Sequence, residues 1–248
     1  MTGRIDLNAD LGEGYGFDGA LMRLVTSCNI ACGGHAGDPV TMRETLIKAR
    51  NAGVVAGAHP SYPDREGFGR RAFDVEPGHL LDLLAEQVRA LTDLAAQEGV
   101  RLAHIKPHGA LYHAAAAHRD TAEVIIRLMQ ACLPDGRLVG PPTGALREAA
   151  AEHNIIYHAE GFVDRVYLDS GDLVPRDQDG AVLDTLAARV AQALDLARSG
   201  RVTTWSGCRL ALPVQTLCLH GDTEGALDTA RAIRRSLLGA GIDVVSLA

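Results

Sequence analysis

Residues that can perform acid, base or metal chemistry follow short apolar runs at several points of the chain. They are Asn8, Asp10, Glu13, His35, His59, Lys106, His108, Glu160, Asp164, Arg165, His220 and Asp222. Carboxylates and imidazoles move protons in catalysis, and an ammonium group stabilises a developing negative charge. One polar residue after a strand is more often a cap or a turn residue. The repetition of the pattern, however, predicts a single catalytic site.

Four of the ten histidines follow a predicted strand and have a glycine or proline neighbour, as expected of tight loops that approach a ligand. These are His35, His59, His108 and His220. Together with Asp10, His35 and His59 would supply one carboxylate and two imidazoles, a ligand set suited to zinc or a related divalent ion. The alternative is that these three groups bind substrate through hydrogen bonds.

Lys106 is a rare choice in this chain, because Lys48 is the only other lysine among 24 basic residues. It follows an apolar run and precedes Pro107. We therefore expect its ammonium group at the end of a strand, where it can donate to an oxyanion or a phosphoryl oxygen. His104 and His108 have the spacing of a helical metal site, but Pro107 prevents that helix. We expect His104 on the strand.

Common catalytic motifs are missing from the sequence. It contains no phosphate-binding loop of the GxxxxGK[ST] type, no HExxH and no GxSxG. Gly14, Gly16 and Gly19 match the dinucleotide fingerprint, but Asp10 and Glu13 come directly before them. Their negative charge opposes a pyrophosphate, so the sequence does not favour a nicotinamide enzyme.

Short apolar runs alternate with segments of helical period, which predicts βα units and a parallel sheet. We expect strands at 4–9, 27–33, 53–58, 101–106, 137–140, 155–159 and 215–219. Helices are expected at 39–52, 77–98, 121–131, 143–153, 181–198 and 223–239. A closed βα barrel of about seven strands is the simplest assembly, although an open doubly wound sheet has the same local pattern. In both folds the polar residues would meet at the carboxyl ends of the strands.

Two helix starts carry capping signals. Asp38 followed by Pro39 is typical of an N-cap and a first helical residue, and Gly53 is a typical helix end. Asp120 and Glu123 have the spacing of a capping box, which predicts a helix that begins at residue 121.

The composition predicts one globular domain over residues 1–248, because 47% of the residues are hydrophobic and 22% are charged. The formal net charge of −7 gives no drive toward nucleic acid or an anionic membrane surface, so neither partner is expected. Five cysteines without a CxxC motif fit a reducing compartment. With no long apolar run and no apolar leader at Met1, we expect a cytoplasmic protein.

Seven motifs in order along the chain resemble those of the LamB/YcsF family. They are DLNADLGE at 6–13, NIACGGHAGD at 29–38, GAHPSYPD at 57–64, GFGRR at 67–71, KPHGALY at 106–112, EGFVDR at 160–165 and LCLHGD at 217–222. The resemblance covers nearly the whole chain. Two positions depart from the family pattern: Gly34 stands where an aromatic residue is expected, and His113 where Asn is expected.

This resemblance implies a seven-stranded βα barrel like that of glycoside hydrolases and polysaccharide deacetylases. It also implies hydrolysis of 5-oxoproline (pyroglutamate) to L-glutamate, with ATP as co-substrate cleaved to ADP and phosphate. The chain would act as one subunit of a complex with PxpB and PxpC. Because the sequence has no phosphate-binding loop, a partner would carry some or all of the ATP site.

The residue types fit this chemistry. A lactam is a stabilised amide, so its hydrolysis needs activation of the carbonyl oxygen, a base for water and a donor for the tetrahedral centre. Candidate catalytic residues are Asp10, Glu13, Lys106, His108 and Asp222. Candidate substrate-binding residues are Asn8, His35, His59, Arg70, Arg71, Arg165 and His220. Two alternatives stay open, namely a metal-dependent deacetylase-like hydrolase that needs no ATP and a non-catalytic subunit that binds 5-oxoproline.

Overall fold

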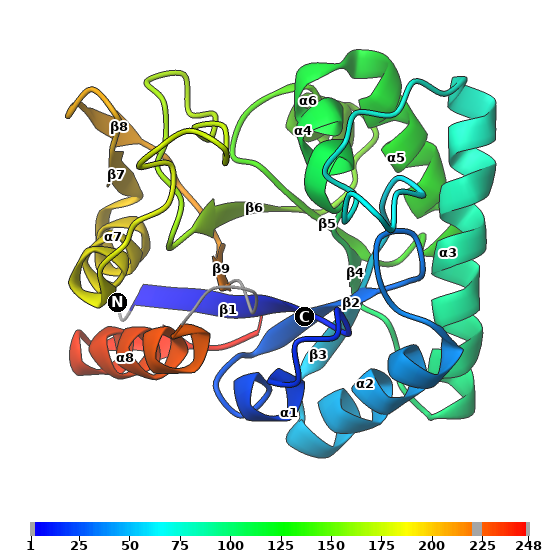
Figure 1. The fold of residues 1–248 in the computed structure, drawn as a ribbon, viewed down its shortest axis with the longest axis horizontal. Helices are drawn as coiled ribbons and strands as arrows, with labels where there is room; N and C mark the ends of the chain where they lie inside the picture. The colour runs from blue at the N-terminus through cyan, green and yellow to red at the C-terminus, as the bar shows by residue number, and fades with distance from the viewer. Residues whose placement is uncertain (1–2, 220–224, 247–248) are drawn as a thin grey trace.

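The computed structural model describes residues 3–219 and 225–246 (Figure 1). The strands are β1 (Gly3–Leu11), β2 (Ser27–Ala31), β3 (Val55–His59), β4 (His104–Ile105), β5 (Arg137–Gly140), β6 (Tyr157–Phe162), β7 (Arg201–Thr203), β8 (Arg209–Ala211), β9 (Thr216–Leu219) and β10 (Ile242–Val244). The helices are α1 (Asp18–Leu21), α2 (Pro39–Ala52), α3 (Pro77–Gln97), α4 (Gly109–Ala117), α5 (Arg119–Cys132), α6 (Ala145–Glu152), α7 (Leu186–Ser199) and α8 (Ala226–Gly239). Among the described residues, no helix is long and apolar enough to cross a membrane.

Seven parallel strands form a closed barrel in the order β1, β2, β3, β4, β5, β6 and β9, and β9 pairs with β1 to complete the ring. The short strand β10 pairs with the beginning of β1. Figure 1 shows α2, α3 and α5 along one side of the strands and α7 and α8 along the other. The expected seven-stranded βα barrel is confirmed, and the open sheet is excluded because the ring closes.

The helices form where apolar residues recur every three or four positions. Helix α3 buries Leu80, Leu84, Val88 and Leu91 toward the strands. At the start of α2, the Asp38 carboxylate accepts hydrogen bonds from the backbone N–H groups of residues 40 and 41, and Gly53 ends that helix at a φ of 66°. Both predicted boundaries of α2 are confirmed, and Asp38 anchors the loop that follows β2.

The predicted capping box at Asp120 is wrong. Helix α5 begins at Arg119, and His118 occupies the N-cap position without a side-chain hydrogen bond. Because the helix starts early, Asp120 already lies in its first turn. Glu123 accepts hydrogen bonds from Arg119, one helical turn earlier. This ion pair on the helix surface stabilises the first turns of α5.

Several other boundaries differ from expectation. Strand β1 continues to Leu11, two residues beyond the predicted end, so Asn8 and Asp10 lie within the strand. Helix α7 begins only at Leu186, because residues 163–185 form a long loop held by isolated strand bridges. The sequence analysis also missed the short helices α1 and α4 and the strands β7, β8 and β10, which are short or lack a clear apolar period.

The inside of the barrel is polar, whereas the apolar core lies between the strands and the helices. Along β1, Leu7, Ala9 and Leu11 belong to the apolar core. The alternate residues Asn8 and Asp10 are buried in a hydrogen-bonded network inside the ring. Some polar residues that the sequence analysis placed at strand ends, such as Asn8, therefore lie inside the barrel.

Gly57 gives room for that network. A Cβ atom at Gly57 would lie 2.2 Å from the imidazole ring of His104. The ring is buried, as predicted for a histidine on the strand, and its Nε2 lies 2.7 Å from Oδ1 of Asn29. Asn29 in turn donates to Asp10. The close approach of β3 and β4 thus supports the residues that hold Asp10.

We expect Gly57→Ala to lower the free energy of unfolding by about 1–3 kcal/mol, because the added methyl group displaces His104 in a well-packed interior. Urea unfolding followed by circular dichroism would measure the change. Gly239→Ala is the matched control, since no atom lies within 4 Å of a Cβ at the end of α8. It should leave stability unchanged or raise it by up to about 1 kcal/mol, because alanine replaces glycine in the last turn of a helix. Equal stability of the two variants would contradict this role of Gly57.

Candidate active site

A cavity of about 340 Å³ opens at the carboxyl ends of the strands. Its ionisable lining consists of Asp10, Glu13, His59, Arg70, Lys106, His108, Tyr112, His113, Arg165 and Arg176. Its apolar and aromatic lining includes Phe68, Tyr112, Phe162 and Leu173. A cavity of this size with a few convergent polar groups fits a small organic ligand.

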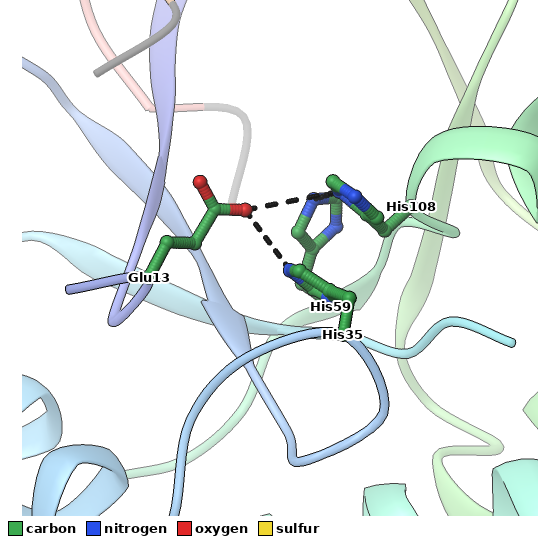
Figure 2. A group of neighbouring side chains, drawn as sticks. All are labelled: Glu13, His35, His59 and His108. Atoms are coloured by element: carbon green, nitrogen blue, oxygen red, sulfur yellow. Dashed lines mark hydrogen bonds and ion pairs between the residues drawn. The ribbon is translucent and has the colours of Figure 1, made fainter. Parts of the chain in front are cut away.

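Four side chains from successive strand ends meet beside this cavity. Glu13 follows β1, His35 follows β2, His59 ends β3 and His108 follows β4. Figure 2 shows Glu13 facing the three imidazoles. One ligand atom of each residue lies within 4.8 Å of the others, so the group could hold a metal ion.

Hydrogen bonds to backbone oxygens set the tautomers of two of these imidazoles. Nδ1 of His59 lies 2.7 Å from the carbonyl oxygen of Lys106, and a carbonyl can only accept. Nε2 of His108 lies 2.9 Å from the carbonyl oxygen of Phe68. Each of these nitrogens must therefore carry a proton, so Nε2 of His59 and Nδ1 of His108 are the nitrogens that a metal ion would bind.

The third imidazole is oriented through a hydroxyl group. Ser61 donates its hydroxyl hydrogen to the carbonyl oxygen of Tyr62 at 3.0 Å. Its oxygen also lies 3.0 Å from Nδ1 of His35. Nε2 of His35 lies 3.0 Å from Oε1 of Glu13, and because a carboxylate only accepts, this contact is a hydrogen bond from the imidazole to Glu13 in the absence of a metal ion.

The ring nitrogens and the carboxylate of this group lie close together. Nε2 of His59 and Nδ1 of His108 are 3.1 Å apart, and Oε1 of Glu13 lies 3.7 Å from Nδ1 of His108. A shared proton or a cation between the atoms stabilises these short separations. A tetrahedral zinc site with bonds of about 2.0–2.1 Å places its ligand atoms about 3.3 Å apart, which is close to these separations.

Burial keeps the imidazoles of His35 and His108 in the neutral form that binds metals. It lowers the pKa of His35 to about 2, with the neighbouring His59 as a further cause. The pKa of His108 is lowered in the same way, by burial and by His59 and His35. A neutral imidazole with its second nitrogen hydrogen-bonded is the usual metal ligand, so three nitrogens and one carboxylate fit a divalent ion.

Lys106 lies next to this group and is 2% exposed. Its Nζ is 2.9 Å from Oδ1 of Asp10 and 2.9 Å from Oε1 of Glu160, and it also contacts Sγ of Cys218 at 3.2 Å. Burial alone would lower the pKa of Lys106, but Asp10, Cys218 and Glu160 raise it well above its usual range. Lys106 is therefore an ammonium group and acts as a hydrogen-bond donor, not as an amine nucleophile.

Asp10 joins Lys106 to the imidazoles. Its Oδ1 accepts hydrogen bonds from Lys106 and from Asn29, and its Oδ2 lies 3.3 Å from Nε2 of His59. The expected metal set was Asp10, His35 and His59. The structure brings the two histidines together but groups them with Glu13 and His108, and it places Asp10 beside them in an ion pair with Lys106.

The other expected binding residues separate into two groups. Arg70 and Arg165 line the cavity. Asn8 is buried inside the barrel, bound to Glu160, and does not line the cavity. Arg71 is 66% exposed and lies near Asp64 on the surface. The remaining two candidates, His220 and Asp222, lie outside the described residues.

Two aromatic residues of the cavity were missed by the sequence analysis. Tyr112 lies one helical turn after His108 on α4, and Phe162 ends β6, two residues after Glu160. Their rings are in edge-to-face contact with centroids 5.8 Å apart. The spacing of four from His108 is the one signal in the sequence that could have placed Tyr112 at the site.

Comparison with known proteins gives relatives over the full length. The model of the LamB/YcsF family matches residues 5–248. A 5-oxoprolinase subunit of Nocardia farcinica is 45% identical over 245 residues, which cover 97% of this chain and 98% of the relative. The corresponding 5-oxoprolinase subunit of Methylococcus capsulatus is also 45% identical, over 100% of this chain and 97% of the relative.

Solved structures agree with these matches. The lactam utilization protein from Thermus thermophilus superposes with a TM-score of 0.92 at 37% identity, covering 98% of this chain and all of the other. A family 4 carbohydrate esterase from Streptomyces lividans has a TM-score of 0.51 at 13% identity, covering 99% of this chain and 93% of the other, and shares the fold alone. With the family pattern and the fold both matched along the whole barrel, the chain belongs to the LamB/YcsF family.

Proposed function

We propose that this protein opens the lactam ring of 5-oxoproline to give L-glutamate, as one component of a complex with PxpB and PxpC that cleaves ATP to ADP and phosphate. The relatives named as 5-oxoprolinase subunits support the substrate. The observation that carries the proposal is the buried ammonium group of Lys106, which is held by Asp10 beside a cavity of small-molecule size.

The chain's own residues supply what lactam hydrolysis requires. Phosphorylation of the lactam oxygen makes the carbonyl carbon more electrophilic. Water then adds to this carbon and gives a tetrahedral centre. Lys106 donates a hydrogen bond to the oxygen on which negative charge develops. Asp10 takes the proton of the attacking water and returns it to the ring nitrogen as the C–N bond breaks, which frees the amino group and leaves an acyl phosphate. Attack of a second water on this acyl phosphate releases phosphate and completes the side-chain carboxylate of glutamate.

The group of Glu13, His35, His59 and His108 would hold a divalent ion. When bound, such an ion polarises a carbonyl or phosphoryl oxygen or lowers the pKa of a bound water. Contacts with backbone oxygens and with the Ser61 hydroxyl orient the three imidazoles that would hold the ion together with Glu13. Asp10 lies between Lys106 and His59. We place the ATP site on the partner proteins, in keeping with the missing phosphate-loop motif.

A second candidate is a metal-dependent hydrolase of the deacetylase type that works without ATP. The cluster of imidazoles and Glu13 favours it. This candidate predicts turnover by the chain alone that a chelator abolishes. A non-catalytic protein that only binds 5-oxoproline would instead keep its binding after every proposed acid and base is replaced.

The first test is reconstitution. We expect the purified chain to release no glutamate from 5-oxoproline, and the chain with PxpB and PxpC to release glutamate only when ATP is present. An enzyme-coupled glutamate assay with paired measurement of ADP would check this. Robust ATP-dependent turnover by the single chain would refute the assignment of the ATP site to the partner proteins. The absence of turnover from the full complex would refute the proposed reaction.

Metal content tests the ligand group. After exposure to zinc and dialysis into metal-free buffer, the chain should retain about one zinc ion, measured by mass spectrometry of the element. His108→Gln should lose this ion because it removes one of the converging nitrogens. His153→Gln, at an exposed histidine of the surface, should retain it. Equal zinc content in the two variants, or none in the unaltered chain, would disprove the site.

Replacement of Lys106 tests the proposed donor. In the reconstituted complex, Lys106→Arg and Lys106→Met should each lower kcat by about 10²–10³, as loss of one oxyanion donor does, because the larger planar guanidinium does not direct its hydrogens as an ammonium group does. Lys48→Arg is the control, at the other lysine of the chain, whose side chain is exposed. A near-normal kcat for folded Lys106→Arg would remove Lys106 from the mechanism.

A further inference from the structure

Three buried side-chain atoms have no hydrogen-bond partner among the described residues. They are the hydroxyl oxygen of Tyr112, Nε of Arg165 and Oε2 of Glu160. Leaving a buried polar group without a partner costs about 1–3 kcal/mol, so such groups mark places where another molecule binds. Tyr112 and Arg165 both line the cavity, whereas Glu160 lies behind Lys106 and does not.

Arg165 is a buried cation that forms no ion pair with a carboxylate of the described residues. It is 6% exposed, and its Nη2 donates to the carbonyl oxygen of Val174 at 2.6 Å, which fixes the guanidinium plane. Burial lowers its pKa, and the nearby Arg176 lowers it further, against a weaker opposite effect of Asp164. No ion pair of Arg165 with a carboxylate occurs within the described part of the chain. A guanidinium stays charged at any pH at which the protein is folded, so this position calls for an anionic ligand.

Tyr112 offers a second donor among the residues that line the cavity. It is 5% exposed, and burial together with Glu160 raises its pKa well above the usual range. The hydroxyl group therefore keeps its proton and can donate it to a ligand. Its ring contacts Phe162, and the ammonium group of Lys106 lies 5.7 Å from the centroid of the Phe162 ring. Phe162 thus connects this donor to the proposed reaction centre.

We propose that Arg165 and Tyr112 bind the carboxylate of the substrate and make the cavity selective for anionic lactams. The N–H at Nε of Arg165 and the hydroxyl of Tyr112 would each donate to one carboxylate oxygen. Phe162 packs against the ring of the ligand, and the lactam carbonyl is thereby directed to Lys106. This assignment rests on the proposed function, and it names two specificity-determining residues for it.

A phosphate would satisfy the same guanidinium, so the test must separate the two anions. Four probes do this with the full-length chain in isothermal titration calorimetry. 5-Oxoproline carries both a lactam and a carboxylate, 2-pyrrolidinone carries the lactam alone, and cyclopentanecarboxylate carries the carboxylate alone. Inorganic phosphate tests whether Arg165 binds a phosphate instead. The variants are Arg165→Met, Arg165→Lys and Tyr112→Phe, with Arg101→Met as a control at an arginine that is 83% exposed.

We expect Arg165→Met to weaken binding of both carboxylates by about 10- to 100-fold, the usual range for a charge-assisted hydrogen bond, and to leave 2-pyrrolidinone unchanged. Tyr112→Phe should weaken the carboxylates by about 3- to 10-fold. Arg165→Lys should recover part of the loss, and Arg101→Met should bind all probes normally. In the reconstituted complex, Arg165→Met should raise KM for 5-oxoproline more than it lowers kcat.

Thermal unfolding of each variant first establishes that it is folded. Equal binding of cyclopentanecarboxylate by the unaltered chain and Arg165→Met, or no binding of either carboxylate by the unaltered chain, would overturn the subsite. Loss of phosphate binding alone in Arg165→Met would assign the position to phosphate and also overturn it. If cyclopentanecarboxylate depends on Arg165 while the complex does not turn over 5-oxoproline, the subsite stands and the proposed reaction fails.

Discussion

The buried positive charge of Lys106 is the constraint on which the site depends. An ammonium group inside a barrel is stable only when anions neutralise it, and here Asp10 and Glu160 each lie 2.9 Å from it. Removing one partner from such a group costs about 3–5 kcal/mol. The polar filling of the barrel follows from this need, because Asn8 donates to Glu160 and Asn29 donates to Asp10.

The same residue connects the ion pairs to the imidazole cluster. The backbone oxygen of Lys106 sets the tautomer of His59, while its side chain draws one oxygen of Asp10 away from that imidazole. The ammonium group of Lys106, which can donate to a negative charge, thereby lies beside the group of Glu13, His35, His59 and His108, which could hold a cation. The barrel provides this arrangement because successive parallel strands deliver their last residues to one rim.

Sequence alone predicted the barrel, most of its helices and the gathering of polar residues, because these follow from local periodicity and from the geometry of parallel strands. It did not separate residues at the rim from residues inside the ring. Asn8 and Asp10 both follow apolar neighbours, yet Asn8 is structural filling and Asp10 reaches the cavity. The sequence analysis grouped Asp10 with His35 and His59, whereas the structure groups these two histidines with Glu13 and His108. This grouping depends on distances between strands, which local sequence patterns do not contain.

The central claim is that four strand ends deliver their lone pairs to one cation next to Lys106. Anomalous diffraction at the zinc edge, from crystals grown with zinc, tests it most directly. The account predicts one strong peak bonded to Nε2 of His35, Nε2 of His59, Nδ1 of His108 and a carboxylate oxygen of Glu13. No peak at this position, or a peak bound by Asp10 with His108 turned away, would contradict it.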